Sequence, residues 1–339
     1  MAKIDKEYHK LLNNIVENGF KYEDPNRKGV NRIQVPSYTI KHDFKDGFPA
    51  ITTKKLYWKG VVGELIWFLR GDTNIKYLVD NGINIWNKDA YNYYCKECKV
   101  HNVDPCEFDK FILFIKNGDN SKNHFIPSKN NYKLGDLGRV YGYQLRNFGG
   151  KFDQLKWIID TMKNNPMATK KTVTFINPND KEHQALTPCH TGFKILVEPI
   201  RYINVLPKAT DPIYQFTLQW EQDSVDTFLG LPFNIASYAL LAQIIGKITN
   251  MKPKGIIGDL SNVHIYEPHL DAVKEQLSRA TDIYEGKTTK VVHFHDLKEH
   301  YESKGLDDLL NSLDINENFV LKNYNSYPRI PAEMLAYNK

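Results

Sequence analysis

A long apolar segment near residue 240 dominates the pattern of this chain. Ile235, Tyr238 and Leu241 begin a series that recurs at the spacing of one helical face across 234–251. The turn-forming residues Gly-Leu-Pro at 230–232 precede the series. The pattern therefore predicts a long core helix.

Shorter patterns predict the elements around that helix. Runs rich in β-branched and aromatic residues indicate strands, whereas apolar residues at helical spacing indicate helices. The predicted strands are 33–44, 172–176, 193–197 and 214–220, and the predicted helices lie within residues 1–20 and at 59–70.

The bulk composition narrows the class of protein. With 339 residues, 41% of them hydrophobic, the chain can bury a substantial core as one large domain or two ordinary ones. Its net charge of +5 comes from 45 basic and 40 acidic side chains without a concentrated basic tract. This charge suits an anionic small molecule and does not require a nucleic acid.

The chain reads as cytoplasmic. It has no run of the about 20 apolar residues that a membrane-spanning helix needs, and residues 1–10 are polar. Its four cysteines are too sparse for a disulfide framework, which favours an intracellular location.

Residues 91–134 are rich in Asn, Lys and Tyr and are predicted to form an inserted subdomain. Cys95, Cys98, His101 and Cys106 lie within it and offer the donor types of a tetrahedral zinc site. The alternative is a pair of helices, 91–101 and 107–116, with the first two cysteines as neighbours on one face. Because no second Cys-x2-Cys pair closes the set, the helical alternative is favoured.

Two further residues stand out by their surroundings. Glu64 lies in the strongly apolar segment 59–70, so its carboxylate must face a solvated cleft or be held by partners. Cys189 follows a proline at the edge of the predicted sheet, where a thiol can reach the mouth of a cleft. A buried, inert cysteine is the alternative.

Several long strings occur in one order along the chain, and with them it resembles the family of thymidylate synthases and deoxynucleotide hydroxymethylases. The resemblance covers roughly residues 5–275 and a short C-terminal tail. The matching strings are DGFP at 46–49, TTK at 52–54, ELIWFLRGDTN at 64–74, GDLGRVYG at 135–142, PCH at 188–190, DTFLGLPFNIASY at 226–238 and HIY at 264–266.

The resemblance implies transfer of a one-carbon unit from 5,10-methylenetetrahydrofolate to C5 of a pyrimidine nucleotide. A thiolate adds to C6 and makes C5 nucleophilic. By the match, Cys189 is this nucleophile, while Glu64, Tyr141 and His190 handle the protons. Asn234 matches the residue that reads the base, and an amide there favours uracil over cytosine.

The resemblance also assigns binding residues. Taken singly, each has a structural alternative, as a core aromatic, a structural histidine or a helix cap. The implied substrate-binding residues are Arg27, Lys170, Lys171, Gln222, Asp223, Ser224, Asn234, His264 and Tyr266, and the implied folate-binding residues are Lys54, Trp86, Asp226, Gly230 and Phe233.

The chain departs from the family where the nucleotide phosphate is expected. Lys170 and Lys171 stand in place of an arginine pair that the family supplies across a dimer interface, and Asp223 stands in place of an arginine. The inverted charge at Asp223 predicts either a replacement cation, such as Arg201 or Lys208, or a pair between Asp223 and Lys171, or a different phosphate end.

The resemblance implies an α/β (α+β) fold with a large, twisted mixed sheet packed by helices, one face of which forms a two-fold dimer interface. It implies one catalytic domain over 1–339 with a closing tail at 325–339, which runs on through Tyr337 to Lys339. Extra tail residues could admit water and give hydroxymethylation instead of methylation.

The expected activity is methylation of dUMP. A dUMP, CMP or dCMP 5-hydroxymethylase is one alternative, and a non-catalytic nucleotide- or RNA-binding relative is another, which Asp223 favours. We expect a homodimer with no metal, no membrane and no required nucleic acid.

Overall fold

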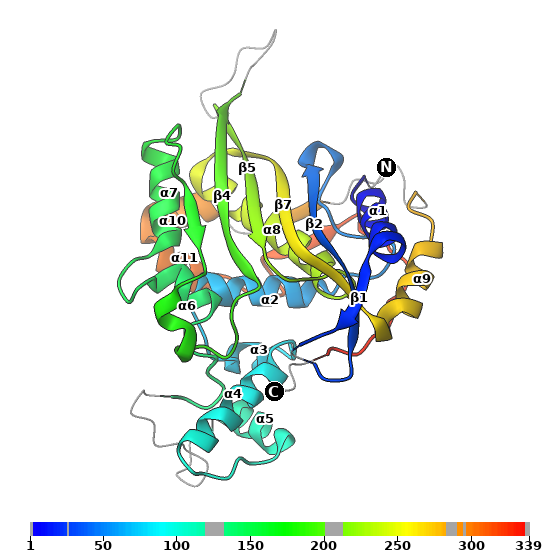
Figure 1. Cartoon of the computed structure of the whole chain (residues 1–339). Coiled ribbons are helices and arrows are strands. Elements are labelled where there is room, and N and C mark those ends of the chain that lie inside the picture. The colour runs from blue at the N-terminus through cyan, green and yellow to red at the C-terminus, as the bar shows by residue number, and fades with distance from the viewer. Residues whose placement is uncertain are drawn as a thin grey trace. The chain divides into compact units, whose positions relative to one another are not determined.

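The computed structural model describes residues 3–25, 27–118, 132–200, 213–282, 290–293 and 296–335 (Figure 1). The chain divides into two compact units. Unit 1 comprises 1–62, 156–173 and 189–339, and unit 2 comprises 63–155 and 174–188. The candidate cations Arg201 and Lys208 and the tail residues 336–339 lie outside the described residues.

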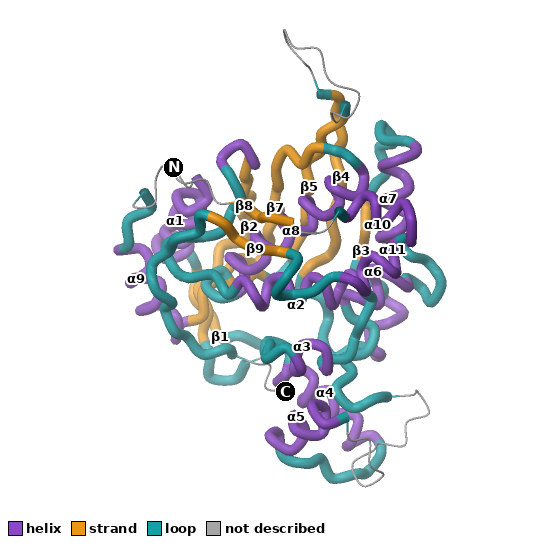
Figure 2. Tube along the Cα trace, turned by 180° about the vertical axis from the view of Figure 1, so that it is seen from behind, coloured by secondary structure: helices purple, strands orange, loops and turns teal. Residues whose placement is uncertain are grey.

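A mixed sheet forms the centre of unit 1, as predicted. Its path runs β1-β2-β7-β5-β4-β3, and β6 pairs with β7. The β1/β2, β2/β7 and β4/β5 pairs are antiparallel, whereas β5 and β6 run parallel to β7. In Figure 2 these strands appear in orange. Their bounds are β1 Phe20–Glu23, β2 Asn31–Asp43, β3 Thr172–Thr174, β4 His190–Pro199, β5 Tyr214–Gln222, β6 Val225–Asp226 and β7 Lys252–Tyr266.

The predicted core helix is α8, Gly230–Thr249, which packs against β7 and β5. It begins before the predicted start at Asn234, because Pro232 is tolerated in a first turn, where main-chain N–H groups have no helical partner. This helix is long and apolar enough to cross a membrane, but 72% of its most apolar window is buried inside the protein. It therefore serves as a core element.

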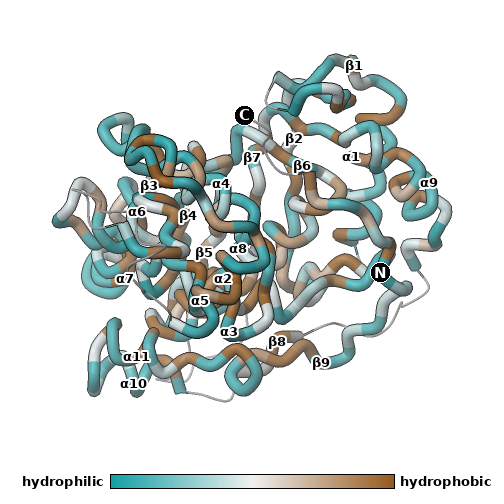
Figure 3. Tube along the Cα trace, turned by 90° about the horizontal axis from the view of Figure 1, so that it is seen from below, coloured by the Kyte–Doolittle hydropathy of each residue, from teal (hydrophilic) through white to brown (hydrophobic). Residues whose placement is uncertain are grey.

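Unit 1 also contains further helices and a small ribbon. Helix α1, Lys3–Asn18, was predicted from its apolar spacing, and Tyr8, Leu11 and Ile15 on its inner face are fully buried. A small ribbon pairs β8, Lys290–His293, with β9, Phe319–Lys322, and Figure 3 shows the apolar colouring of β9. The remaining elements are η1 Phe44–Asp46, η3 Glu267–His269, α9 Leu270–Ser278, α10 Leu297–Lys304 and α11 Leu306–Ser312.

Unit 2 is mainly helical. Helix α2, Trp58–Leu69, begins in unit 1 and continues into unit 2, close to the predicted bounds, and α7 has its first residues in unit 2. The helices of this part are α3 Lys76–Asp80, α4 Asn87–Val100, α5 Phe108–Asn117 and α6 Tyr141–Asn147, with η2 Pro178–His183, whereas most of α7 Gln154–Asn164 belongs to unit 1.

The segment predicted as an inserted subdomain contains the expected helix pair, α4 and α5. Tyr91 packs edge-on against Phe111 across the pair, and Cys106 donates its backbone N–H to the hydroxyl of Tyr94. Burial raises the pKa of the Cys98 thiol. Among the described residues, which include all four candidate ligands, no group of three or more His, Cys, Asp or Glu could hold a metal. Cys95 and Cys98 both lie on α4, and the expected pair of helices is confirmed.

Candidate functional site

Cys189 lies immediately before β4 in unit 1, where the sheet register is irregular. Its backbone carbonyl accepts a hydrogen bond from the N–H of Asp223 at 2.8 Å, and the register shifts between His190 and Gly192. Such irregularities re-aim side chains at the end of a strand. Cys189 is partly exposed and not in a disulfide, so it is not a buried cysteine, and its reactivity stays a prediction.

His190 is held as a neutral imidazole. Its Nε2 lies 3.1 Å from the amide nitrogen of Asn234, and its Nδ1 lies 2.9 Å from the hydroxyl of Tyr238. With this amide orientation Asn234 donates, so Nε2 accepts and Nδ1 carries the proton that is donated to Tyr238. Burial lowers the pKa of His190 to about 4, which keeps the ring uncharged at neutral pH.

Asn234 has its amide group fixed by two partners. Besides His190, its Nδ2 lies 3.1 Å from Oε1 of Gln222, whose own Nε2 donates to the carbonyl of Ser224 at 3.0 Å. Both amide hydrogens are thereby used within the protein. The oxygen Oδ1 remains as an acceptor of fixed orientation.

Tyr238 was not among the predicted site residues. It lies one helical turn after Asn234 on α8, and its ring stacks on the buried Trp220 of β5 with centroids 5.0 Å apart. That stack fixes the hydroxyl that contacts His190. The four-residue spacing from Asn234 was a signal that could have identified it.

The turn before α8 contains several predicted folate-binding residues. Oδ1 of Asp226 accepts from the N–H groups of Phe228 (3.1 Å) and Leu229 (3.2 Å), so this carboxylate does cap the turn. Lys54 donates to the carbonyl of Phe228, and its ammonium lies 3.5 Å from the centre of that ring. Burial lowers the pKa of Lys54 to about 7, against the opposing effect of Asp226. Gly230 follows in the first turn of α8.

Phe233 lies in the same first turn of α8 and is partly exposed. A Cβ atom at Gly60 would lie 3.2 Å from its ring. These residues of unit 1 thus surround one end of the core helix.

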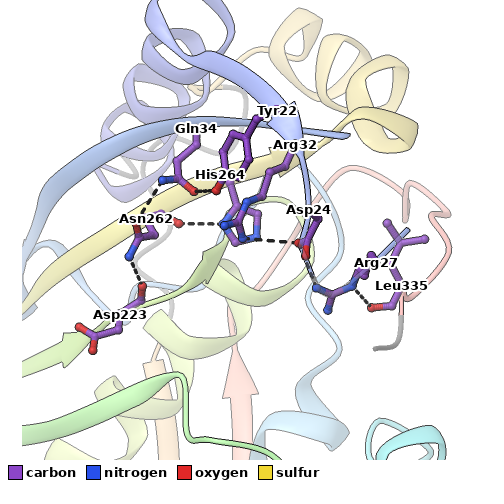
Figure 4. Close-up of polar contacts among 9 residues, drawn as sticks. All are labelled: Tyr22, Asp24, Arg27, Arg32, Gln34, Asp223, Asn262, His264 and Leu335. Carbon is purple, nitrogen blue, oxygen red and sulfur yellow. Dashed lines mark hydrogen bonds and ion pairs between the residues drawn. The ribbon is translucent and has the colours of Figure 1, made fainter. Parts of the chain in front are cut away.

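A second group of predicted residues lies at the ends of β2 and β7 (Figure 4). The guanidinium of Arg27 lies 4.8 Å from the ring centre of Tyr266, is 3.2 Å from Asp24, and donates from Nε to the carbonyl of Leu335 at 2.9 Å. Nδ1 of His264 donates to the carbonyl of Asn262 at 2.7 Å. Burial lowers the pKa of His264, so its Nε2 is an acceptor.

The predicted pair between Asp223 and Lys171 is not found. Asp223 is exposed, whereas Lys171 is buried and donates to the carbonyls of Pro166 (2.7 Å) and Ala168. The ammonium of Lys171 is therefore bound by carbonyls of its own loop, while solvent and salt screen the charge of the exposed Asp223 carboxylate. Lys170, next to it, is exposed.

In unit 2, Glu64 lies among aromatic rings. Nε1 of Trp86 donates to its Oε1 at 2.7 Å, and Phe68 packs on Tyr141 with centroids 4.9 Å apart, next to Trp86. Burial raises the pKa of Glu64 to about 7, although the hydrogen bond from Trp86 works against this shift. A carboxyl with this pKa can both take up and release a proton near neutrality.

Comparisons with known proteins cover both units. A family model described as thymidylate synthase matches residues 6–336. The thymidylate synthase of Mycoplasma genitalium is 41% identical over 276 residues, which cover 81% of this chain and 86% of that protein. Those of Malacoplasma penetrans and Staphylococcus haemolyticus are 35% and 34% identical, over 97% and 98% of this chain and 99% and 98% of theirs.

Proposed function

Because the chain belongs to the thymidylate synthase family and is a folate-dependent methyltransferase that converts dUMP into dTMP, we propose that Cys189 is its nucleophile. The partial exposure of this free cysteine at the irregular start of β4 is the observation that carries the proposal. The comparisons do not favour the hydroxymethylase alternative.

The reaction needs a thiolate that adds to C6 of the pyrimidine, because C5 is otherwise a poor nucleophile. The co-substrate 5,10-methylenetetrahydrofolate supplies the one-carbon unit and its reducing equivalents. Cys189 later leaves C6 again, so its sulfur has to remain accessible through the cycle. A partly exposed cysteine next to a strand meets this need.

Asn234 is proposed to select uracil. Since both hydrogens of its amide are used by His190 and Gln222, its Oδ1 presents a fixed acceptor. Uracil carries a hydrogen on N3 that can donate to this oxygen, whereas cytosine presents a lone pair there. Two facing lone pairs repel, so cytosine should be rejected.

Glu64 is proposed to move the C5 proton, with Tyr141 and His190 assisting. A carboxyl with a pKa of about 7 is divided between its two protonation states at neutral pH, which suits a group that accepts and returns a proton. The neutral ring of His190 supplies hydrogen bonds without adding charge.

The folate-binding role of Lys54, Trp86, Asp226, Gly230 and Phe233 stays a proposal. Asp226 fits it in part, because Oδ1 is used by the turn while Oδ2 is left to accept from a pterin N–H. Trp86 presents a partly exposed ring. His264 and Tyr266 are proposed for the sugar hydroxyl.

The same proposal includes a cytoplasmic homodimer that binds no membrane and requires no nucleic acid. Exposed Lys170 is a candidate for the phosphate of the partner's nucleotide. Buried Lys171 would first have to release the carbonyls of Pro166 and Ala168.

The nucleophile is tested by covalent trapping. We expect 5-fluoro-dUMP and 5,10-methylenetetrahydrofolate to form a stable adduct that mass spectrometry of peptides assigns to Cys189. Cys189→Ala should abolish both the adduct and dTMP formation, while Cys106→Ala should preserve both. An adduct on another cysteine would contradict the assignment, and no adduct at saturating ligand would favour a non-catalytic relative.

Base selection is tested by comparing dUMP with dCMP. We expect kcat/KM for dUMP to exceed that for dCMP by at least about 100-fold, the size expected when a buried polar group is left opposed. Mass analysis of the product should show a 5-methyl group. Equal use of the two nucleotides would overturn the role of Asn234.

A further inference from the structure

Arg32 lies in a row of three residues that crosses the sheet of unit 1. In the strand register Tyr22 of β1 pairs with Arg32 of β2, which pairs with Tyr266 of β7. Directly paired residues point to the same face of a sheet, and so do residues two apart on one strand. Arg32 therefore shares a face with His264 and Tyr266, the residues proposed to bind the sugar.

The guanidinium of Arg32 lies against an aromatic ring. It lies over the ring of Tyr22 at 4.7 Å, and the Tyr22 hydroxyl donates to Gln34 at 2.7 Å. Gln34 in turn donates to Asn262 at 3.1 Å. Asn262 donates to the carbonyl of Asp223 at 2.8 Å, so one chain of hydrogen bonds joins the platform under Arg32 to the Asp223 turn (Figure 4).

Arg32 also belongs to a cluster with an excess of positive charge. Asp24, whose side chain is 0% exposed, lies 3.2 Å from Arg27 and 3.5 Å from Arg32. These three groups together carry two positive charges and one negative charge. The excess charge is mostly enclosed, since the Arg32 side chain is 14% exposed, and enclosed charge favours a counter-ion.

Two buried polar atoms in this region lack partners among the described residues. One is Nε of Arg32, a donor, and the other is Nε2 of His264. In the register of β2 and β7, Arg32 pairs with Tyr266 and His264 lies two residues before Tyr266, so the two side chains are diagonal neighbours on one face. A buried donor without a partner is costly, so the protein alone does not satisfy this guanidinium.

We propose that Arg32, together with Arg27, binds the phosphate of dUMP and supplies the positive charge that is missing at Asp223. The inference rests on the proposed function for the identity of the anion. An arginine offers the two parallel donors that a phosphate accepts. Stacking on Tyr22 and the contact with Asp24 fix the direction of that fork before the nucleotide arrives.

The test compares dUMP with deoxyuridine, which lacks the phosphate. Arg32→Gln should raise the Kd for dUMP, measured by calorimetry, about 10- to 100-fold, the loss expected for a hydrogen bond between charged groups. The inhibition constant for deoxyuridine should change less than about 2-fold. Arg32→Lys, which keeps the charge and loses the fork, should fall between Arg32→Gln and the wild type.

Lys21→Gln is the matched control. This variant removes one positive charge from β1, where the exposed Lys21 forms an ion pair with Glu267. In the strand register Lys21 pairs with Ile33, so its side chain points to the face opposite that of Arg32. It should leave the Kd for dUMP unchanged. Unfolding temperatures of all variants separate folding defects from binding defects.

Equal losses for dUMP and deoxyuridine, or no loss for either, would overturn the proposal. If Arg32→Gln fails to fold, the Arg32→Lys variant decides: an unchanged ratio of the two affinities rejects the phosphate contact. The proposed function has its own readout, because trapping of Cys189 by saturating 5-fluoro-dUMP does not depend on the position of the phosphate cation.

Discussion

Glu64 shows how much the setting of a single residue determines its chemistry. The sequence predicted that this carboxylate needs a solvated cleft or partners, and among the described residues Trp86 donates a hydrogen bond to it in aromatic surroundings. One neutral donor does not offset the cost of burial, so the proton is held up to about pH 7. The proton-handling role proposed for Glu64 therefore carries a cost in stability.

That cost predicts an unusual pH dependence for Glu64→Gln. The carboxyl has a pKa of 4.5 in the unfolded chain and about 7 when folded, so its contribution to stability is complete below about pH 4.5 and is lost as the pH rises to 7. Gln cannot ionise and still accepts from Trp86. We expect the variant to be more stable than the wild type by about 1–3 kcal/mol near pH 8 and equal to it near pH 4.5.

Urea unfolding across this pH range measures the difference. Glu107→Gln, at an exposed carboxylate, should show no such divergence. A Glu64→Gln variant that is less stable at every pH would show that the carboxylate is held in its charged form. The variant should also lose most of its turnover, whatever its stability.

At the scale of elements, sequence patterns predicted individual strands and helices, whose features depend on residues near one another in the chain. The strand 33–44 and the helix 59–70 match β2 and α2 because their periodicity reports burial directly. The partner of each strand was not predictable. Arg32 lies opposite Tyr266 because of the register of β2 against β7, and that register depends on contacts between residues far apart in the chain. The sequence alone therefore does not place Arg32 at the site.

Gly258 is a position where the pairing of two strands affects residues of the candidate site. Trp220 of β5 lies opposite Gly258 of β7, and a Cβ there would lie 2.3 Å from the Trp220 ring. We expect Gly258→Ala to lower the free energy of unfolding by about 1–3 kcal/mol, because a buried indole cannot move away freely. Since Trp220 stacks on Tyr238, which contacts His190, turnover should fall as well.

Adding Trp220→Phe to Gly258→Ala tests this explanation. The smaller ring removes the atoms that clash, so the double variant should be less destabilised than the sum of the single variants, as urea unfolding would measure. Strictly additive losses would show that the glycine serves another purpose.

At the scale of the whole molecule, the distant segments of unit 1 are joined through the C-terminal tail. Tyr327 donates its N–H to Thr52, Arg279 donates to the carbonyl of Pro328, and His269 lies 2.8 Å from the carbonyl of Glu333. The resemblance predicted a closing tail at 325–339; these contacts join its described part, 325–335, to other segments of unit 1, and its closing role stays a prediction. Its contact with Arg27, through Leu335, was not evident from the sequence, because a backbone carbonyl leaves no mark on residue type.

Removal of residues 332–339 should affect activity more than stability. It deletes two accepting carbonyls, those of Glu333 and Leu335, and leaves most of the buried core untouched. We expect turnover of dUMP to fall at least about 10-fold, as for a lost closing segment, and the unfolding temperature to fall by only a few degrees. A collapse of the unfolding temperature with normal turnover of the folded fraction would reverse this interpretation.

The tail is held through main-chain groups at four positions: the N–H of Tyr327 and the carbonyls of Pro328, Glu333 and Leu335. The contacts of Arg27, His269 and Arg279 are to main-chain carbonyls, which almost any amino acid at those positions would provide. Substitution at the exposed positions of 328–335 should therefore be tolerated, except by proline where it would redirect the chain, whereas Ile330 is buried and should not be. The amino-acid sequence at exposed positions of the tail can therefore diverge between relatives while these main-chain hydrogen bonds are kept.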